Sequence, residues 1–238
     1  ENYEASSDSK TFNIGKAAAT VTLGSLNQTY DGNAKSATVT TFPEDLTVAI
    51  TYDGSPSEPT AAGNYAVVAK VIDENYQGTA SGTLLIGKAT PTATLEVTNT
   101  PLTFSGSTQS AIVEITSSSE PGSVANVING THTNAGTYPV TADFVPEDTD
   151  NYNSLTGLAA GNLVIERKLL QVNADAKTKV YGENDPAITF TATGFVDGDT
   201  ESILTGGLSR TEGENVGNYA INQGDLSAGN NYTISFTG

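Results

Sequence analysis

The sequence contains no cysteine, methionine or tryptophan, and it contains one histidine. Without cysteine there are no disulfides, thiolate metal sites or thiol nucleophiles. His132 lies in the polar segment NGTHTNAG, where the sequence places neither an orienting carboxylate nor a nucleophile beside it. A catalytic histidine depends on such a group of residues, so we interpret His132 as a solvated loop residue. No glycine-rich segment opens a helix after a strand, as a phosphate-binding loop would, and we predict that the chain is not an enzyme.

Basic residues are also scarce, because 10 lysines and arginines stand against 27 acidic residues and leave a net charge of −17. Nucleic acid and anionic membranes are bound through lysine and arginine, so we expect neither as a partner. The same charge keeps a long exposed chain soluble. No apolar run approaches the roughly 20 residues of a membrane helix, and no signal peptide precedes Glu1. If the protein is secreted, we expect its targeting and anchoring segments to lie outside this chain.

The sequence contains internal repeats. The segment IGKA occurs at 14–17 and again at 86–89, and the related segment LVIERKLL occupies 163–170. An Asn-Tyr pair precedes each of the three, and the pairs are Asn2–Tyr3, Asn75–Tyr76 and Asn151–Tyr152. Self-similarity at such a period is the signature of a tandem-repeat architecture.

Two further markers align the repeats. Each repeat opens with a similar motif, namely TYDGNAKSA from Thr29, TFSGSTQSA from Thr103 and VYGENDPA from Val180. Each also carries a Gly-x-Tyr motif, found in AGNYAV at 62–67, AGTYPV at 135–140 and VGNYAI at 216–221. We predict three homologous domains at 17–88, 89–167 and 168–238, with residues 1–16 forming the closing strand of a preceding repeat.

Composition predicts an all-β fold. The chain has 24 glycines and 9 prolines, together with many Thr, Ser and Val residues, which favour short strands joined by turns. After the second Gly-x-Tyr motif, Tyr138, Val140, Ala142 and Phe144 alternate with polar residues, as in a half-buried strand. The corresponding strand of the first repeat also has apolar residues, including Val68 and Ile72, on its opposite face. We therefore predict that this strand is central and covered on both faces.

The Gly-x-Tyr motifs suggest which layers pack together. In immunoglobulin domains a tyrosine near the start of strand F bonds back to the backbone just upstream, in a tyrosine corner. Tyr65, Tyr138 and Tyr219 are candidates for this role, and an aliphatic residue stands where the second core cysteine would be. We predict three small immunoglobulin-like β-sandwich domains. The segment GDTESILTGGL offers Thr200 as an N-cap and Gly206 as a stop, so either a short helical turn near 200–205 or a plain turn into a strand is expected there.

The third repeat, from KVYGENDPAITF onward, resembles the MBG domain of YGX type, a module of tandem arrays in bacterial cell-surface and adhesin-like proteins. The first repeat, with Tyr30, Asp31 and Gly32, resembles the related YDG type. The second repeat departs from both at Phe104 and Ser105. The resemblance implies an extended extracellular surface protein built from repeats, and it implies no reaction. We accordingly expect a stalk or spacer segment on the bacterial surface or in a secreted protein, a rod of limited bending whose partners are neighbouring repeats.

Two other functions stay open. Loops at a sandwich end could bind carbohydrate or a host protein, since Tyr76, Tyr152 and Tyr232 stand near Asn and Asp residues. Because these tyrosines recur in every repeat, we favour packing roles for them. Calcium could stiffen the array through acidic pairs, but two carboxylates supply only part of its six to eight oxygen ligands, so we favour solvated turns and expect no other cofactor. The candidate calcium ligands are Asp148, Asp150, Asp197 and Asp199.

The two ends of the chain suggest a third alternative. Residues 1–16 match the closing segment of a repeat, whereas only TISFTG follows Tyr232 in the third repeat. Either the chain is a window of a longer array, or it is a filament subunit joined by donor-strand complementation. In the second case Thr11–Lys16 of one copy, led by Thr11, Phe12, Asn13 and Ile14, pairs beside Asn231–Phe236 of the next.

Overall fold

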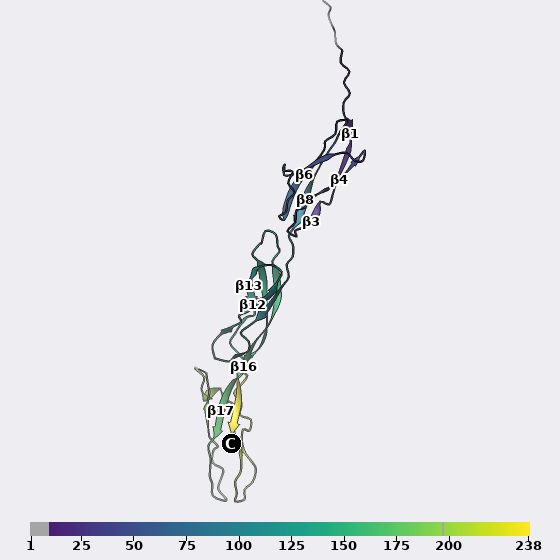
Figure 1. The fold of residues 1–238 in the computed structure, drawn as a ribbon. Helices are drawn as coiled ribbons and strands as arrows, with labels where there is room; N and C mark the ends of the chain where they lie inside the picture. Colours follow the sequence, from purple (N-terminus) through teal and green to yellow (C-terminus); the bar gives the residue numbers. More distant parts are fainter. Residues whose placement is uncertain (1–9, 197) are drawn as a thin grey trace, which may run out of the picture. The chain divides into compact units, whose positions relative to one another are not determined.

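The structure, a computed structural model, describes residues 10–196 and 198–238 (Figure 1). The predicted Asn2–Tyr3 pair and the candidate ligand Asp197 lie outside these residues. The regular structure is almost entirely β-strand, which confirms the predicted all-β class. The chain packs as two compact units, one formed by the residues up to Pro91 with Asp148–Asn153, the other by Thr92–Glu147 with Ser154–Gly238. The boundaries of these two units are not those of the three repeats expected from the sequence.

The first unit is built around β6 (Gly63–Val71), which pairs antiparallel with β8 (Thr79–Gly87) and with β5 (Val48–Tyr52). The short strand β3 (Asn27–Thr29) adds to β8 in parallel, so the sheet order is β3-β8-β6-β5. A second, antiparallel sheet packs over β6 and β8 through Leu23. It consists of β2 (Thr20–Gly24) and β4 (Thr38–Phe42), while β1 (Ala17–Ala18) pairs in parallel with β7 (Tyr76–Gln77).

The core of the first unit lies between these two sheets. Val67, Leu84 and Ile86 are at most 1% exposed, and burying a side chain of this size contributes about 1.5–3 kcal/mol each. The hydroxyl of Tyr52 accepts a hydrogen bond from the Ala37 N–H at 2.9 Å, so the polar group of this buried side chain is satisfied.

The outer face of β6 corrects one prediction. β6 is central, as expected, but Val68 is 40% exposed and Ile72, just beyond the strand, is 59% exposed. The β2–β4 sheet covers only the face that carries Val67 and Ala69. Single apolar residues are common on protein surfaces, and a continuous apolar run is therefore weak evidence for burial on both faces.

In the second unit β15 (Gly136–Pro146) and β16 (Leu155–Glu166) form a long antiparallel pair. The predicted alternation is confirmed, since Val140, Ala142 and Phe144 are at most 1% exposed. β13 (Gly122–Ile128) and β10 (Leu102–Thr103) complete the order β10-β16-β15-β13, with β10 parallel to β16. The second repeat also contains the antiparallel pairs β9 (Ala93–Val97) with β12 (Val113–Ser118) and β11 (Gln109–Ser110) with β14 (Thr131–His132).

The third repeat has a smaller sheet, in which β17 (Lys168–Ala174) lies between β18 (Phe190–Thr193) and β21 (Tyr232–Thr237). The β17–β21 pair is parallel. A separate antiparallel pair joins β19 (Ser209–Arg210) to β20 (Ile221–Asn222). The 3₁₀ turn η1 (Glu201–Ile203) is capped by Thr200, whose hydroxyl accepts from the Ser202 N–H. Of the two alternatives expected near 200–205, the structure has the short helical turn. No helix in the described part of the chain is long and apolar enough to span a membrane.

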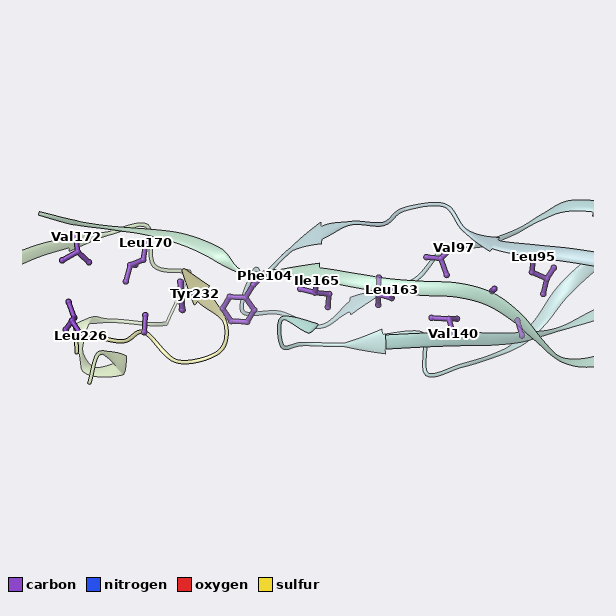
Figure 2. Close-up of a cluster of buried hydrophobic side chains, with 13 residues drawn as sticks. Leu95, Val97, Phe104, Val140, Leu163, Ile165, Leu170, Val172, Leu226 and Tyr232 are labelled. Carbon is purple, nitrogen blue, oxygen red and sulfur yellow. The ribbon is translucent and has the colours of Figure 1, made fainter. Parts of the chain in front are cut away.

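The second and third repeats share one hydrophobic cluster. Figure 2 shows Phe104 and Tyr232 between the side chains of the second repeat, such as Ile165, and those of the third repeat, such as Leu170. All are at most 5% exposed. A repeat of this length buries little surface by itself, and sharing a cluster enlarges the core of both.

Candidate functional site

The tyrosines of the three Gly-x-Tyr motifs make the same hydrogen bond. Each hydroxyl donates to the carbonyl four residues upstream, which is the contact made in a tyrosine corner. The pairs are Tyr65 with Ala61 at 2.9 Å, Tyr138 with Asn134 at 2.9 Å and Tyr219 with Asn215 at 2.8 Å. The loop before the strand is thereby held against the tyrosine ring. At Gly136 a Cβ would lie 2.8 Å from the Tyr138 hydroxyl, so the close approach of this loop requires glycine.

In the first unit, an Asn-Tyr pair docks on the loop held by Tyr65. Asn151 Oδ1 accepts a hydrogen bond from the Ala62 N–H at 2.8 Å. The ring of Tyr152 meets the ring of Tyr30 edge-on, with centroids 5.3 Å apart and planes at 86°. The Ala89 N–H donates to the Asn151 carbonyl at 2.9 Å. This junction thus combines one amide contact, one aromatic contact and one backbone contact.

In the second unit, the third repeat makes the same junction with the second. Asn231 Oδ1 accepts from the Ala135 N–H at 2.9 Å. The ring of Tyr232 meets that of Phe104 edge-on, with centroids 5.4 Å apart and planes at 80°. The Lys168 N–H donates to the Asn231 carbonyl at 2.9 Å. Phe104, where the sequence departs from the Tyr of the other repeats, therefore serves the same aromatic contact.

Tyr232 is more deeply buried than its counterpart. It is 3% exposed, its hydroxyl donates to Asp199 Oδ2 at 2.6 Å, and it accepts from the Val196 N–H at 3.0 Å. Burial raises the pKa of Tyr232, and the hydrogen bond to the Asp199 carboxylate raises it further. Tyr232 is therefore held in its neutral, protonated form.

Each asparagine is held in one orientation by a partner for its amide nitrogen. In the first unit Asn151 Nδ2 donates to Asp148 Oδ2 at 2.8 Å, and this bond is the main reason that the pKa of Asp148 is lowered. In the second unit Asn231 Nδ2 donates to Asn134 Oδ1 at 3.1 Å. With the NH₂ group engaged, the amide oxygen points to the backbone N–H of the preceding repeat.

A third loop of this kind stands in the first repeat at Asn75–Tyr76. Asp73 Oδ1 accepts from the N–H groups of Asn75 and Tyr76 at 2.7 and 2.9 Å, and the Asn75 carbonyl accepts from the Ala17 N–H at 2.8 Å. The backbone of the junction loop is therefore preformed. Within residues 10–196 and 198–238, no group bonds to the Asn75 side-chain amide.

His132 has a packing role, and its prediction as a solvated loop residue is wrong. It belongs to β14, is half-buried and stacks on the ring of Tyr138 with centroids 3.5 Å apart and planes at 6°. Its Nε2 lies 2.9 Å from Asn129 Oδ1. The ring covers a corner tyrosine, which the linear sequence could not show.

The acidic pairs proposed for calcium have other contacts. Asp148 holds the Asn151 loop, and Asp199 accepts the Tyr232 hydroxyl. Asp150 lies in the same loop as Asp148, and Asp197 lies outside the described residues. Across residues 10–196 and 198–238, no three His, Asp or Glu side chains gather closely enough to hold a metal ion. The calcium hypothesis therefore rests on the sequence alone.

Residues 19–90 match the MBG domain family, and residues 170–238 match the MBG domain of YGX type. The chain therefore carries two MBG domains in tandem. MBG domains are structural repeat modules of surface proteins, and the chain corresponds to a repeat region of such a protein. No curated protein and no solved structure matches the chain. The Asn-Tyr pairs Asn75–Tyr76 and Asn231–Tyr232 both lie within the matched MBG residues.

The sequence revealed the Asn-Tyr pairs as repeat markers but not their partners. The missed residues are Ala62 and Ala135, because they act through backbone N–H groups that any residue but proline carries. The constant order of the motifs was a signal that could have found these donors. A tyrosine corner fixes the loop before its strand, so the backbone N–H of the residue before the motif glycine is held in place to bond the asparagine.

Proposed function

We propose that this chain is a non-catalytic stalk or spacer segment of a bacterial cell-surface protein, in which Asn-Tyr pairs couple each repeat to the repeat before it. The observation that carries the proposal is the recurrence of one junction with the same three contacts. The hydrogen bonds from Ala62 and Ala135 and the edge-on aromatic pairs at 5.3 and 5.4 Å match closely. A freely jointed linker would need none of these contacts.

Composition supports an exposed setting. The net charge of −17 keeps a long chain soluble and prevents it from adhering to like-charged surfaces. The carbohydrate-binding alternative lacks a supporting observation, because the rings of Tyr152 and Tyr232 pack on Tyr30 and Phe104. Antibodies against residues 17–88 should label intact cells, and labelling only after permeabilisation would contradict the surface location.

The coupling can be tested within the second unit, because the chain has no cysteine to interfere with labelling. Spin labels on cysteines at Ser117 and Thr191, both exposed, report the distance between the second and third repeats. We expect a narrow distance distribution that broadens in the double variant Asn231→Ala, Tyr232→Ala. Asn222→Ala, an exposed asparagine of the same repeat, should leave it unchanged. A distribution equally narrow in the double variant would contradict the proposed role of the junction.

A further inference from the structure

The amide nitrogen of each junction asparagine has an acceptor, and the two junctions supply this acceptor from opposite sides. In the first unit the acceptor is Asp148, which lies three residues before Asn151 in the same loop. In the second unit it is Asn134, which belongs to the preceding repeat and bonds to Asn231 across the junction. The effect is the same in both, because a bonded NH₂ group leaves the amide oxygen to face the backbone N–H.

The acceptor in the preceding repeat stands at a fixed place in the tyrosine corner. Asn134 is the residue whose carbonyl receives the Tyr138 hydroxyl. In the first repeat the same place is taken by Ala61, whose carbonyl receives the Tyr65 hydroxyl. We call this place the corner position. Because an alanine side chain carries no acceptor, the corner position of the first repeat cannot hold the amide nitrogen of Asn151.

The acceptor in the following repeat also stands at a fixed place, three residues before the junction asparagine. We call this place the loop position. It is Asp148 in the loop that leads to Asn151, and Ala228 in the loop that leads to Asn231. The two junctions are therefore complementary. Alanine at the corner position is combined with aspartate at the loop position in one, and asparagine is combined with alanine in the other.

Burial explains why the third repeat does not supply its own acceptor. Ala228 is 7% exposed and belongs to the hydrophobic cluster that the second and third repeats share. A carboxylate in such an apolar cluster is costly. The acceptor of this junction therefore has to come from the other side, and Asn134, which is exposed, provides it.

The loop position of the first junction has the opposite setting. Asp148 is exposed, and it accepts from the Asn151 N–H at 3.1 Å and from Asn151 Nδ2 at 2.8 Å. Lys88 Nζ donates to the carbonyl of Thr149, the next residue, at 2.6 Å, so a cation stands beside this carboxylate. A charged side chain is thus tolerated here, and the loop holds its own asparagine.

We propose that the corner position decides which following repeat a repeat accepts. A corner with alanine accepts only a loop that carries its own acceptor, as the loop of Asp148 does. A corner with asparagine also accepts a loop without one, as the loop of Ala228 is. The third repeat is therefore matched to the second repeat and mismatched to the first. The inference rests on the proposed coupling of repeats through Asn-Tyr pairs, and it adds a rule for their order.

A mismatched junction has alanine at both positions. The NH₂ group of the junction asparagine then has no acceptor in the protein, and the amide oxygen is no longer held towards the backbone N–H of the preceding repeat. The hydrogen bond between the repeats weakens, while the aromatic contact remains. Exchange of the bonded amide proton with solvent reports this bond directly.

The first test builds the mismatch in the full chain. Asp148→Ala gives the first junction the loop residue of the third repeat. We expect the Ala62 amide proton to exchange about fivefold faster, the change that corresponds to one hydrogen bond, and NMR measures it. Asp150→Ala is the matched control, because it removes an exposed carboxylate from the same loop. It should leave the exchange rate unchanged.

The second test restores the match from the other side. Asp148 also accepts the Asn151 N–H, so the rescue and not the loss decides. Ala61→Asn, added to Asp148→Ala, gives the first junction the residues of the second and should return the exchange of the Ala62 proton to the parent rate. Ala61→Leu, which adds a side chain of similar size without an acceptor, should not. Ala61 is exposed, so these variants keep the fold.

The third test applies the rule to the second unit. Asn134→Ala leaves the Asn231 amide nitrogen without its acceptor, so the Ala135 amide proton should exchange about fivefold faster. Asn134→Asp keeps an oxygen acceptor at the corner position and should retain the parent rate. Equal rates in these two variants would overturn the proposal.

Two results in the first unit would also overturn it. One is an unchanged exchange rate of the Ala62 proton in Asp148→Ala, and the other is the absence of any rescue by Ala61→Asn. The distance measurement on the double variant of Asn231 and Tyr232 tests the coupling itself. If that distribution stays narrow, the proposed function fails. If it broadens and the rescue is absent, the coupling stands and only the rule of order is wrong.

Discussion

Tyr152 and Tyr232 occupy the same position in two junctions, yet their surroundings differ. Both follow an asparagine bonded to a backbone N–H, and both meet an aromatic ring edge-on. Tyr232 is 3% exposed and has two partners for its hydroxyl, whereas Tyr152 is half-buried. In the third repeat Phe195 meets the ring of Tyr232 edge-on, and Val196 and Asp199 bond to its hydroxyl.

The comparison separates the constant part of the junction from its variable part. The asparagine contact depends on the backbone, and it recurs although the sequences around it differ. The burial of the ring depends on what the following repeat adds around it. Junctions of one geometry can therefore differ in stability, and the difference should lie in the tyrosine rather than in the asparagine.

The largest effect is expected for Tyr232→Ala. Removing a buried aromatic side chain from a core costs about 3–5 kcal/mol, and this cluster is shared by two repeats. Tyr152→Ala should cost clearly less, because its ring keeps solvent contact. Urea unfolding monitored by hydrogen exchange of peptides from each unit measures both. Equal losses in the two variants would remove the distinction drawn between the junctions.

Tyr232→Phe isolates the hydroxyl and should cost about 1–3 kcal/mol, because the Val196 N–H loses its acceptor. It should also change the response to alkaline pH. The folded pKa of Tyr232 is raised, so its contribution is present below the unfolded value of about 10 and is lost as pH rises through the folded pKa. The parent should therefore lose stability in the second unit above about pH 10. If Tyr232→Phe loses as much there as the parent does, another group is responsible.

The asparagines should be nearly equivalent when replaced by alanine. Asn151→Ala and Asn231→Ala each remove the hydrogen bond accepted from a backbone N–H, worth about 1 kcal/mol, and also the bond that the amide nitrogen donates to Asp148 or Asn134. The amide protons of Ala62 and Ala135 should then exchange faster, which NMR can measure residue by residue. Aspartate separates the two junctions, because Asn151→Asp places a carboxylate beside Asp148 and Asn231→Asp places one beside the neutral Asn134. Asn151→Asp should be the more damaging, and the reverse order would contradict the amide orientations.

The smallest effect is the loss of stability expected in the third repeat when the pH is lowered. Arg210, and after it Lys179, lowers the pKa of Asp185 to about 2. A depressed pKa contributes stability above the unfolded value of about 4 that is lost as pH falls towards the folded value. The Asp185 carboxylate is exposed, so the loss of stability should be modest. Hydrogen exchange around residues 179–185 between pH 5 and pH 2 should show it, and Asp185→Asn should flatten the profile.

Local patterns predicted much of this fold. The alternation after Gly136 identified the buried face of β15, and Thr200 marked the 3₁₀ turn, because strand periodicity and capping depend on residues close in sequence. The shared cluster was not predictable, since Phe104 and Tyr232 meet only through the docking of two repeats. The stacking of His132 on Tyr138 was missed for a different reason, because the two rings meet only through the folding of β14 and β15 within the second repeat.

The parallel strand pairs have a consequence for a chain under tension. In the first repeat β3 lies on the N-terminal side of the chain and β8 on the C-terminal side, and these two strands are hydrogen-bonded in parallel over Asn27–Thr29. Opposed forces on parallel neighbours act along the strand axes, so the bonds between them are loaded together rather than one after another. The β17–β21 pair has the same geometry over Lys168–Asn173. A pull on the two ends of either repeat would therefore load these pairs in shear.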